Sequence, residues 1–163
     1  MTSFRLLADS DPVFFEEAHV TFRKILIAVD SEPVAAHAAN VGVELARALG
    51  AEMALVTVVD SALGYPADTG VSPDELLSLA KQDAKGLLDN FRQRLPQHAG
   101  AMEFILTGNP ATEIVKAAKE WPADVIVIGS HGRGGVPRVL LGSVAEGVMR
   151  HAPCPVLVIR AKE

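Results

Sequence analysis

The sequence predicts an α/β fold: a doubly wound, open sheet of five parallel strands with helices on both faces. Two observations predict it. Short runs of almost only apolar residues, rich in Val and Ile, are typical of strands buried on both faces, as in parallel sheets. Segments with helix-starting and helix-ending residues separate these runs, so the elements alternate as β-α-β-α-β-α-β-α-β. Right-handed crossovers between parallel strands then place helices on both faces.

The strands are expected where the apolar runs are continuous. Four runs are clear: Ile25 to Val29, Met53 to Val59, Val125 to Ile128 and Val156 to Ile159. A weaker run at Met102 to Leu106 supplies the fifth strand.

The first two helices have recognisable ends. An Ala-rich stretch follows Pro33 and runs to Leu49, where Gly50 is placed to end it. The second helix begins at 72–75 (Ser-Pro-Asp-Glu), which combines an N-cap, a proline at the first helical position and a capping-box Glu. Pro96 closes it. The connection before it, residues 61–72, is long and could act as a lid.

The last two helices follow the third and fourth strands. One starts at Asn109-Pro110 and stops before Pro122. The other follows Gly142-Ser143 and ends near Pro153, and Ser143 with Glu146 forms a capping-box pattern.

Composition limits the class of protein. The chain of 163 residues has 49% hydrophobic and 21% charged residues, as an ordinary globular domain has. Its one cysteine, Cys154, cannot form an internal disulfide, and Asp and Glu interrupt every apolar run near the N-terminus, unlike a signal peptide. We therefore expect a cytoplasmic protein. No apolar stretch approaches the roughly 20 residues that span a bilayer, and the net charge of −5 argues against nucleic-acid or membrane binding.

Residues 1–22 lie outside the alternating pattern and are expected to be an N-terminal extension to the α/β domain at 23–163. Four of the six phenylalanines are in this extension, which suggests that it packs on something.

The most informative stretch follows the fourth strand. It contains five glycines within fourteen residues, Gly129, Gly132, Gly134, Gly135 and Gly142, and ends at a helix start. Glycines allow close approach of the backbone to phosphates, and a helix N-terminus offers free N–H groups and partial positive charge. Between 125 and 145 there is no Asp or Glu, whereas His131, Arg133 and Arg138 are basic. The pattern predicts a phosphate-binding loop.

Each of these features also has a purely structural explanation. Gly129 and Gly132 could make a tight turn, the hydroxyl of Ser143 could serve only as a helix cap, and His131 could be an ordinary loop residue. Asp30, directly after the first strand, could bind a ribose hydroxyl or a metal-bound water, or belong to the turn that leads into Pro33.

No catalytic group or metal site can be assembled from the sequence. The histidines lack H-E-x-x-H spacing, no G-x-S-x-G elbow is present, and no Walker A motif occurs. The dinucleotide-binding pattern G-x-G-x-x-G fails because Pro137 stands where the third glycine after Gly132 and Gly134 is required.

Three segments together resemble the universal stress protein family. They are the spacing Gly129-x2-Gly132-x9-Gly142-Ser143, the opening strand Ile25 to Asp30, and the closing segment His151 to Ile159. The resemblance covers residues 23–161. It implies the strand order 3-2-1-4-5, a homodimer formed by pairing of the last strands, and ATP binding in the branch that carries this glycine motif.

The resemblance also implies site residues, position by position. Around the adenine and ribose would lie Ala28, Val29, Asp30 and Val58; around the ribose and phosphates would lie Ile128, Gly129, His131, Gly132, Gly142, Ser143 and Val144, with Arg133 adding positive charge. Mg or Mn would bind through the phosphates. One departure is Glu32, where the family often has Ser and where a carboxylate would repel a phosphate if it pointed inward.

Three functions are therefore weighed. The first is an ATP-binding regulatory or stress-response protein with little or no turnover, at most slow ATP hydrolysis. The second is a slow nucleotide hydrolase or transferase that uses the same site. The third, a dinucleotide-binding oxidoreductase, fails on the glycine spacing.

Overall fold

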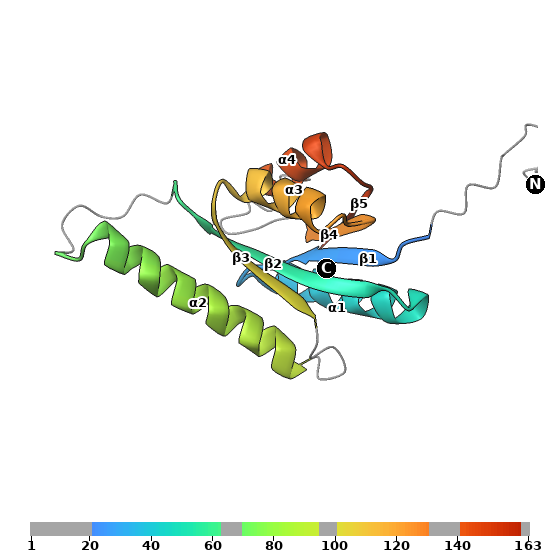
Figure 1. Cartoon of the computed structure of the whole chain (residues 1–163), viewed down its shortest axis with the longest axis horizontal. Coiled ribbons are helices and arrows are strands. Elements are labelled where there is room, and N and C mark those ends of the chain that lie inside the picture. Colours follow the sequence, from blue (N-terminus) through green and yellow to red (C-terminus); the bar gives the residue numbers. More distant parts are fainter. Residues whose placement is uncertain (1–20, 63–69, 95–100, 131–140, 161–163) are drawn as a thin grey trace, which may run out of the picture.

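The computed structural model describes residues 21–62, 70–94, 101–130 and 141–160. Nine strands and helices alternate along these residues, in the predicted order (Figure 1). They are β1 (Lys24–Ala28), α1 (Pro33–Leu49), β2 (Glu52–Asp60), α2 (Pro73–Arg94), β3 (Met102–Gly108), α3 (Pro110–Glu120), β4 (Val125–Gly129), α4 (Ser143–His151) and β5 (Val156–Ile159).

The strands form one parallel sheet in the order β3-β2-β1-β4-β5, which confirms the predicted fold class and topology. The central strand β1 pairs with β2 on one side and β4 on the other, so Ile25 lies opposite both Met53 and Val125. The ends of the strands differ from the prediction by one or two residues. β1 ends at Ala28, although the N–H of Val29 still donates to the carbonyl of Val56 over 2.9 Å.

Helices cover both faces of the sheet, as predicted. Figure 1 shows α1 and α2 on one face and α3 and α4 on the other. We call these the α1/α2 face and the α3/α4 face. Successive side chains of a strand point to opposite faces: Ile25, Ile27 and Val29 belong to the core cluster of the α1/α2 face, whereas Leu26 and Ala28 belong to that of the α3/α4 face.

Three helix ends have the predicted chemistry. Gly50 ends α1 in the left-handed conformation, with φ of 62°. The Oγ of Ser72 accepts the N–H of Glu75 over 3.2 Å at the start of α2. The Oδ1 of Asn109 accepts the N–H of Thr112 over 3.1 Å at the start of α3. Each bond satisfies a backbone group that the helix itself leaves without a partner.

The helix α4 begins where it was predicted, but its cap differs from the predicted one. Gly142, not Ser143, is the N-cap, and Ser143 is the first helical residue, so the capping box of Ser143 and Glu146 does not form. The N–H of Gly142 donates to the carbonyl of Ser130 over 2.7 Å, which fixes Gly142 in extended conformation before the helix. Glu146 instead pairs with Arg150, one turn further along, at 2.8 Å.

Two remaining expectations lie partly outside the described residues. Of the four phenylalanines in the N-terminal extension, Phe22 is described, and it packs against the core cluster of the α1/α2 face. The lid expected at 61–72 falls largely on residues 63–69, which the structure does not describe. Among the helices in the described ranges, none is long and apolar enough to cross a membrane.

Candidate functional site

The candidate site lies at the carboxyl ends of β1 and β4. The chain passes from β1 outward to β2 and β3 on one side, then returns to add β4 and β5 on the other. The strand order therefore reverses between β1 and β4, which is where doubly wound sheets bind ligands. Asp30 follows β1 and Ser130 follows β4 at this edge.

Four of the residues predicted from the sequence are brought together on the α3/α4 face. Ala28, Val58 and Ile128 come from three different strands and belong to the same hydrophobic cluster as Val144 of α4. Val58 and Val144 are half-buried, so this cluster is only partly covered at the carboxyl edge. Val144 belongs to the first turn of α4, so the cluster reaches the start of that helix.

Val29 lies differently from its neighbour Ala28. Its side chain is buried in the cluster of the α1/α2 face, because adjacent residues of an extended chain point in opposite directions. Only the main chain of Val29 can therefore reach a ligand on the α3/α4 face.

One backbone hydrogen bond fixes the N-terminus of α4 to the end of β4, and another fixes the end of β4 to β5. Ser130, which is 1% exposed, receives the N–H of Gly142 on its carbonyl and donates its own N–H to Ile159, both over 2.7 Å. The N–H groups of Ser143, Val144 and Ala145 have no acceptor inside the helix, because they belong to its first turn. They carry the positive end of the helix dipole. Ser143 is exposed and does not cap the helix.

Gly129 has a packing role that the sequence did not reveal. A Cβ atom at this position would lie 3.0 Å from Cγ1 of Val34 and 3.4 Å from the backbone nitrogen of Ala35. The end of β4 therefore approaches the first turn of α1 so closely that a larger side chain would force Val34 to shift. The sequence analysis weighed two roles for this glycine, a tight turn and a ligand contact. The structure adds a third role, the close packing of β4 on α1.

Asp30 belongs to the turn that leads into α1. Its Oδ1 accepts the N–H of Glu32 over 2.8 Å, and Glu32 is the N-cap residue of the helix. This is the turn role that the sequence analysis weighed. A carboxylate has acceptor sites for about four hydrogen bonds, so a turn role and a ligand role are compatible.

The remaining site residues predicted from the sequence, His131, Gly132 and Arg133, lie outside the described residues. Arg138, the other source of the expected positive charge, also lies there. Within 21–62, 70–94, 101–130 and 141–160 no group of three His, Cys, Asp or Glu side chains is arranged to hold a metal ion.

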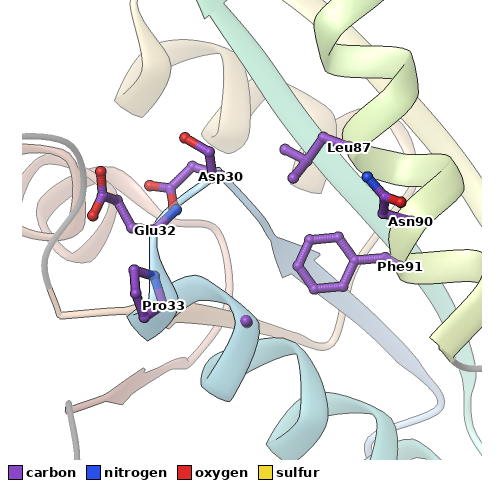
Figure 2. A pocket seen from close by; sticks show the side chains of 8 residues that line it. Asp30, Glu32, Pro33, Leu87, Asn90 and Phe91 are labelled. Atoms are coloured by element: carbon purple, nitrogen blue, oxygen red, sulfur yellow. The ribbon is translucent and has the colours of Figure 1, made fainter.

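A cavity of about 290 Å³ lies behind the Asp30 turn, between the first turn of α1 and α2 (Figure 2). Sequence reasoning missed it. Leu87 and Phe91 of α2 line this space together with Asn90, which nothing in the sequence marks.

Cys154 lies away from this edge, just before β5, in an environment that disfavours its thiolate form. Burial raises the pKa of Cys154, and the nearby Asp124 carboxylate raises it further, because both disfavour the thiolate; a backbone hydrogen bond from Ile126 acts in the opposite direction.

We expect the alkylation of Cys154 by iodoacetamide to follow a pH profile whose midpoint lies above about 8.5, the ordinary thiol value. In urea the midpoint should return to about 8.5, because unfolding removes both causes. The midpoint of the profile reports the pKa of the thiol, whereas steric access changes the alkylation rate at every pH. A native midpoint below the unfolded one would contradict this assignment.

Comparison with known proteins identifies relatives over most of the chain. The family model described as "Universal stress protein family" matches residues 21–160. A universal stress protein of Methanocaldococcus jannaschii is 36% identical over 143 residues, which cover 85% of this chain and 82% of that protein. One of Bacillus subtilis is 32% identical over 147 residues, which cover 85% of this chain and 99% of that protein.

The fold agrees with these sequence matches. A solved universal stress protein of Lactobacillus plantarum superimposes with a TM-score of 0.72 at 33% identity, covering 85% of this chain and 98% of that one. The glycine spacing, the opening strand and the closing segment, which carried the resemblance in the sequence, all lie within the matched residues. The chain belongs to the universal stress protein family.

Proposed function

We propose that this protein binds ATP at the junction of β1 and β4 and acts as a regulatory or stress-response module with little or no turnover. One observation carries the proposal. The hydrophobic cluster that holds Ala28, Val58 and Ile128 also includes Val144, in the first turn of α4, and Val58 and Val144 are only half-buried in it. An apolar surface suits an adenine ring, and a helix N-terminus suits phosphates.

The proposed roles follow from these positions. Ala28 and Val58 would contact the adenine, with Asp30 and the backbone of Val29 near the ribose. The N–H groups of the first turn of α4 would hold phosphate oxygens. We assign the ribose and phosphates to the same residues as before: Ile128, Gly129, His131, Gly132, Arg133, Gly142, Ser143 and Val144, with Gly129 acting mainly by letting β4 approach α1.

Proteins of the same fold are known with adenine nucleotides. One universal stress protein was solved in complex with cAMP, at 22% identity to this chain and a TM-score of 0.65. Another, from Arabidopsis thaliana, was solved with AMP bound, at 23% identity and a TM-score of 0.62. Their likeness to this chain is one of fold, so the proposal for ATP depends on the chain's own residues.

The alternative of a slow hydrolase or transferase can be separated from binding alone. Purified protein would be incubated with ATP and either Mg²⁺ or Mn²⁺, and bound nucleotide would be compared with released phosphate over hours. We expect nearly all bound nucleotide to remain ATP, because no general base or charge clamp can be named. Stoichiometric release of phosphate would instead establish a hydrolase.

Asp30 gives a graded test of the ribose assignment. We expect Asp30→Ala to weaken ATP binding by about 1 to 3 kcal/mol, since it removes a charged acceptor. Asp30→Asn is the matched control for the turn, because its amide oxygen can still accept the N–H of Glu32. Calorimetry on both variants, with and without divalent metal, measures the difference. If neither variant changes affinity, Asp30 is a turn residue only.

We further propose a homodimer joined through β5. This strand is at the edge of the sheet, it is uniformly apolar, and Leu157 is 37% exposed. An apolar edge of this kind favours pairing with another chain, and a two-fold axis closes the assembly.

Leu157→Lys should convert the dimer to a monomer at micromolar concentration, as measured by light scattering. Leu157 is a better test position than Val158, because Val158 packs in the cluster of the α3/α4 face and its replacement would disturb the monomer. Met102→Lys is the matched control: Met102 is 50% exposed on β3, the opposite edge strand. A monomeric mass for the unaltered protein would refute the dimer.

The proposed partners are thus a small nucleotide and a second copy of the chain, and neither nucleic acid nor membrane. The net charge of −5 supports this, because polyanionic partners would be repelled. We also propose a cytoplasmic location, because a single partly buried thiol suits a reducing compartment.

A further inference from the structure

The packing of α4 on α3 depends on a glycine in the second turn of α4. Gly147 lies one turn after Ser143, the first residue of the helix. A Cβ atom on Gly147 would lie 2.7 Å from the Cβ atom of Ala111, the second residue of α3. Cβ atoms in proteins essentially never come closer to a neighbour than 3.0 Å. The two helices therefore meet so closely that any side chain at position 147 would force one of them to shift.

No other feature of this position calls for glycine. The backbone at Gly147 is helical, so no left-handed conformation is needed there. Glycine is also a poorer helix former than alanine, and it weakens a helix in its interior. Gly86, in the interior of α2, shows the contrast, because a Cβ atom there would meet nothing within 4 Å. What distinguishes Gly147 is thus the room that it leaves for α3.

Of the two helices, α4 is the one that would yield to a side chain at this contact. The longer helix, α3, buries four of its residues, Ile114, Val115, Ala117 and Ala118. The shorter helix, α4, buries two, Ala145 and Val148. Because less buried apolar surface holds α4 in place, it is displaced at lower cost than α3.

A displacement of α4 would change the position of the N–H groups in its first turn. These groups, on Ser143, Val144 and Ala145, are the ones proposed to hold phosphate oxygens. Hydrogen bonds to phosphate are about 2.7 to 2.9 Å long and weaken steeply when the donor is misaligned. A methyl group at position 147 would have to move from 2.7 Å to about 3.4 Å from Ala111 to make an ordinary contact. A shift of this size lengthens or bends such bonds.

We propose that Gly147 is a positioning residue of the nucleotide site. It lets α4 lie against α3, and this contact sets where the N–H groups of the first turn of α4 stand relative to Ala28, Val58 and Ile128. The inference rests on the proposed binding of ATP at this junction. It adds that the phosphates depend on Gly147 and that the base does not.

Gly147→Ala tests this role through the difference between ATP and adenosine, which has the same base and ribose but no phosphates. ATP binding is measured by calorimetry, and adenosine binding by an NMR titration of the backbone amides. We expect the variant to bind ATP about tenfold more weakly, since misplaced donors lose part of their charge-assisted hydrogen bonds, and adenosine within about twofold of the unaltered protein. Gly86→Ala is the matched control, because it makes the same change in a helix where there is room, and both affinities should stay unchanged.

A second change, on α3, provides a rescue. Ala111→Gly removes the methyl group that the new side chain would meet, so the double variant of Gly147→Ala with Ala111→Gly should bind ATP within about twofold of Ala111→Gly alone. A fold that was merely weakened would lose adenosine as well and would not regain ATP in this way. The double variant also decides the test if Gly147→Ala does not fold, because we expect the double variant to fold and to bind ATP.

The outcomes separate this inference from the proposed function. If the unaltered protein binds no ATP, the proposed function fails, and the role of Gly147 fails with it. If the unaltered protein does bind ATP, other results would overturn the role of Gly147 alone. They are an unchanged ATP affinity in Gly147→Ala, an equal loss of ATP and adenosine, and a loss that Ala111→Gly does not rescue.

Discussion

Gly142→Val should reduce ATP affinity by about 100-fold or more, a loss of about 2.7 kcal/mol. Gly142 is the N-cap of α4, and its backbone, with φ of −74° and ψ of 155°, is extended. Valine adopts this conformation without strain. Its branched side chain would, however, stand next to the N–H groups of Ser143 and Val144, where the proposed phosphates bind.

The effect on folding should be small, which makes this variant informative. Valine is a poorer N-cap than glycine by about 1 kcal/mol, so the melting temperature should fall by about 2 to 4 °C. Gly142→Ala keeps the backbone geometry with a smaller side chain and should lose less affinity. Calorimetry measures the ATP affinity of each variant, and a melting curve measures its stability. An unchanged affinity in Gly142→Val would show that α4 does not bind the phosphates.

Gly129→Val, in contrast to Gly142→Val, should mainly affect stability. We expect it to lower the free energy of unfolding by about 3 kcal/mol. Its Cβ would lie 3.0 Å from Cγ1 of Val34, and the branches of valine would extend further into the first turn of α1. The backbone nitrogen of Ala35 lies 3.4 Å from this Cβ, so the two methyl groups of valine would press on the helix itself. Urea unfolding, followed by circular dichroism, measures the loss.

Gly129→Ala is the matched control for this prediction. Its single methyl group meets mainly Val34, which can give by a few tenths of an ångström, so we expect a loss of about 1 kcal/mol. A Gly129→Val protein that kept its stability but lost ATP would show that this glycine serves the ligand rather than the packing of β4 on α1.

The sheet could be predicted because its signal is local. The buried strands β1 and β4 are apolar runs that end at a polar residue or a glycine, and only Thr57 interrupts β2. The run of β5 was also expected to be buried on both faces, but it is half-exposed at the edge of the sheet. The order of the strands could not be predicted from these runs, and only the family resemblance supplied it. The cap of α4 could not be predicted, because the sequence Ser143 to Glu146 has a capping pattern while a tertiary bond from Gly142 to Ser130 decides the cap.

The candidate site was predictable in part. Strand alternation alone places Ala28 and Val29 on opposite faces, so the separate position of Val29 was readable from the sequence. The packing role of Gly129 was not, because it depends on the distance between β4 and α1. The same holds for Asn90, which is exposed on α2 and lines the cavity only because α2 is docked beside the Asp30 turn.

The central claim is that ATP binds at the junction of β1 and β4, and calorimetric titration of the purified, nucleotide-free protein with ATP and Mg²⁺ tests it most directly. A ligand of roughly 30 heavy atoms at about 0.3 kcal/mol each gains about 9 kcal/mol, which corresponds to an affinity near micromolar. We predict one ATP bound per chain in this range. No detectable binding of ATP at millimolar concentration would contradict the claim.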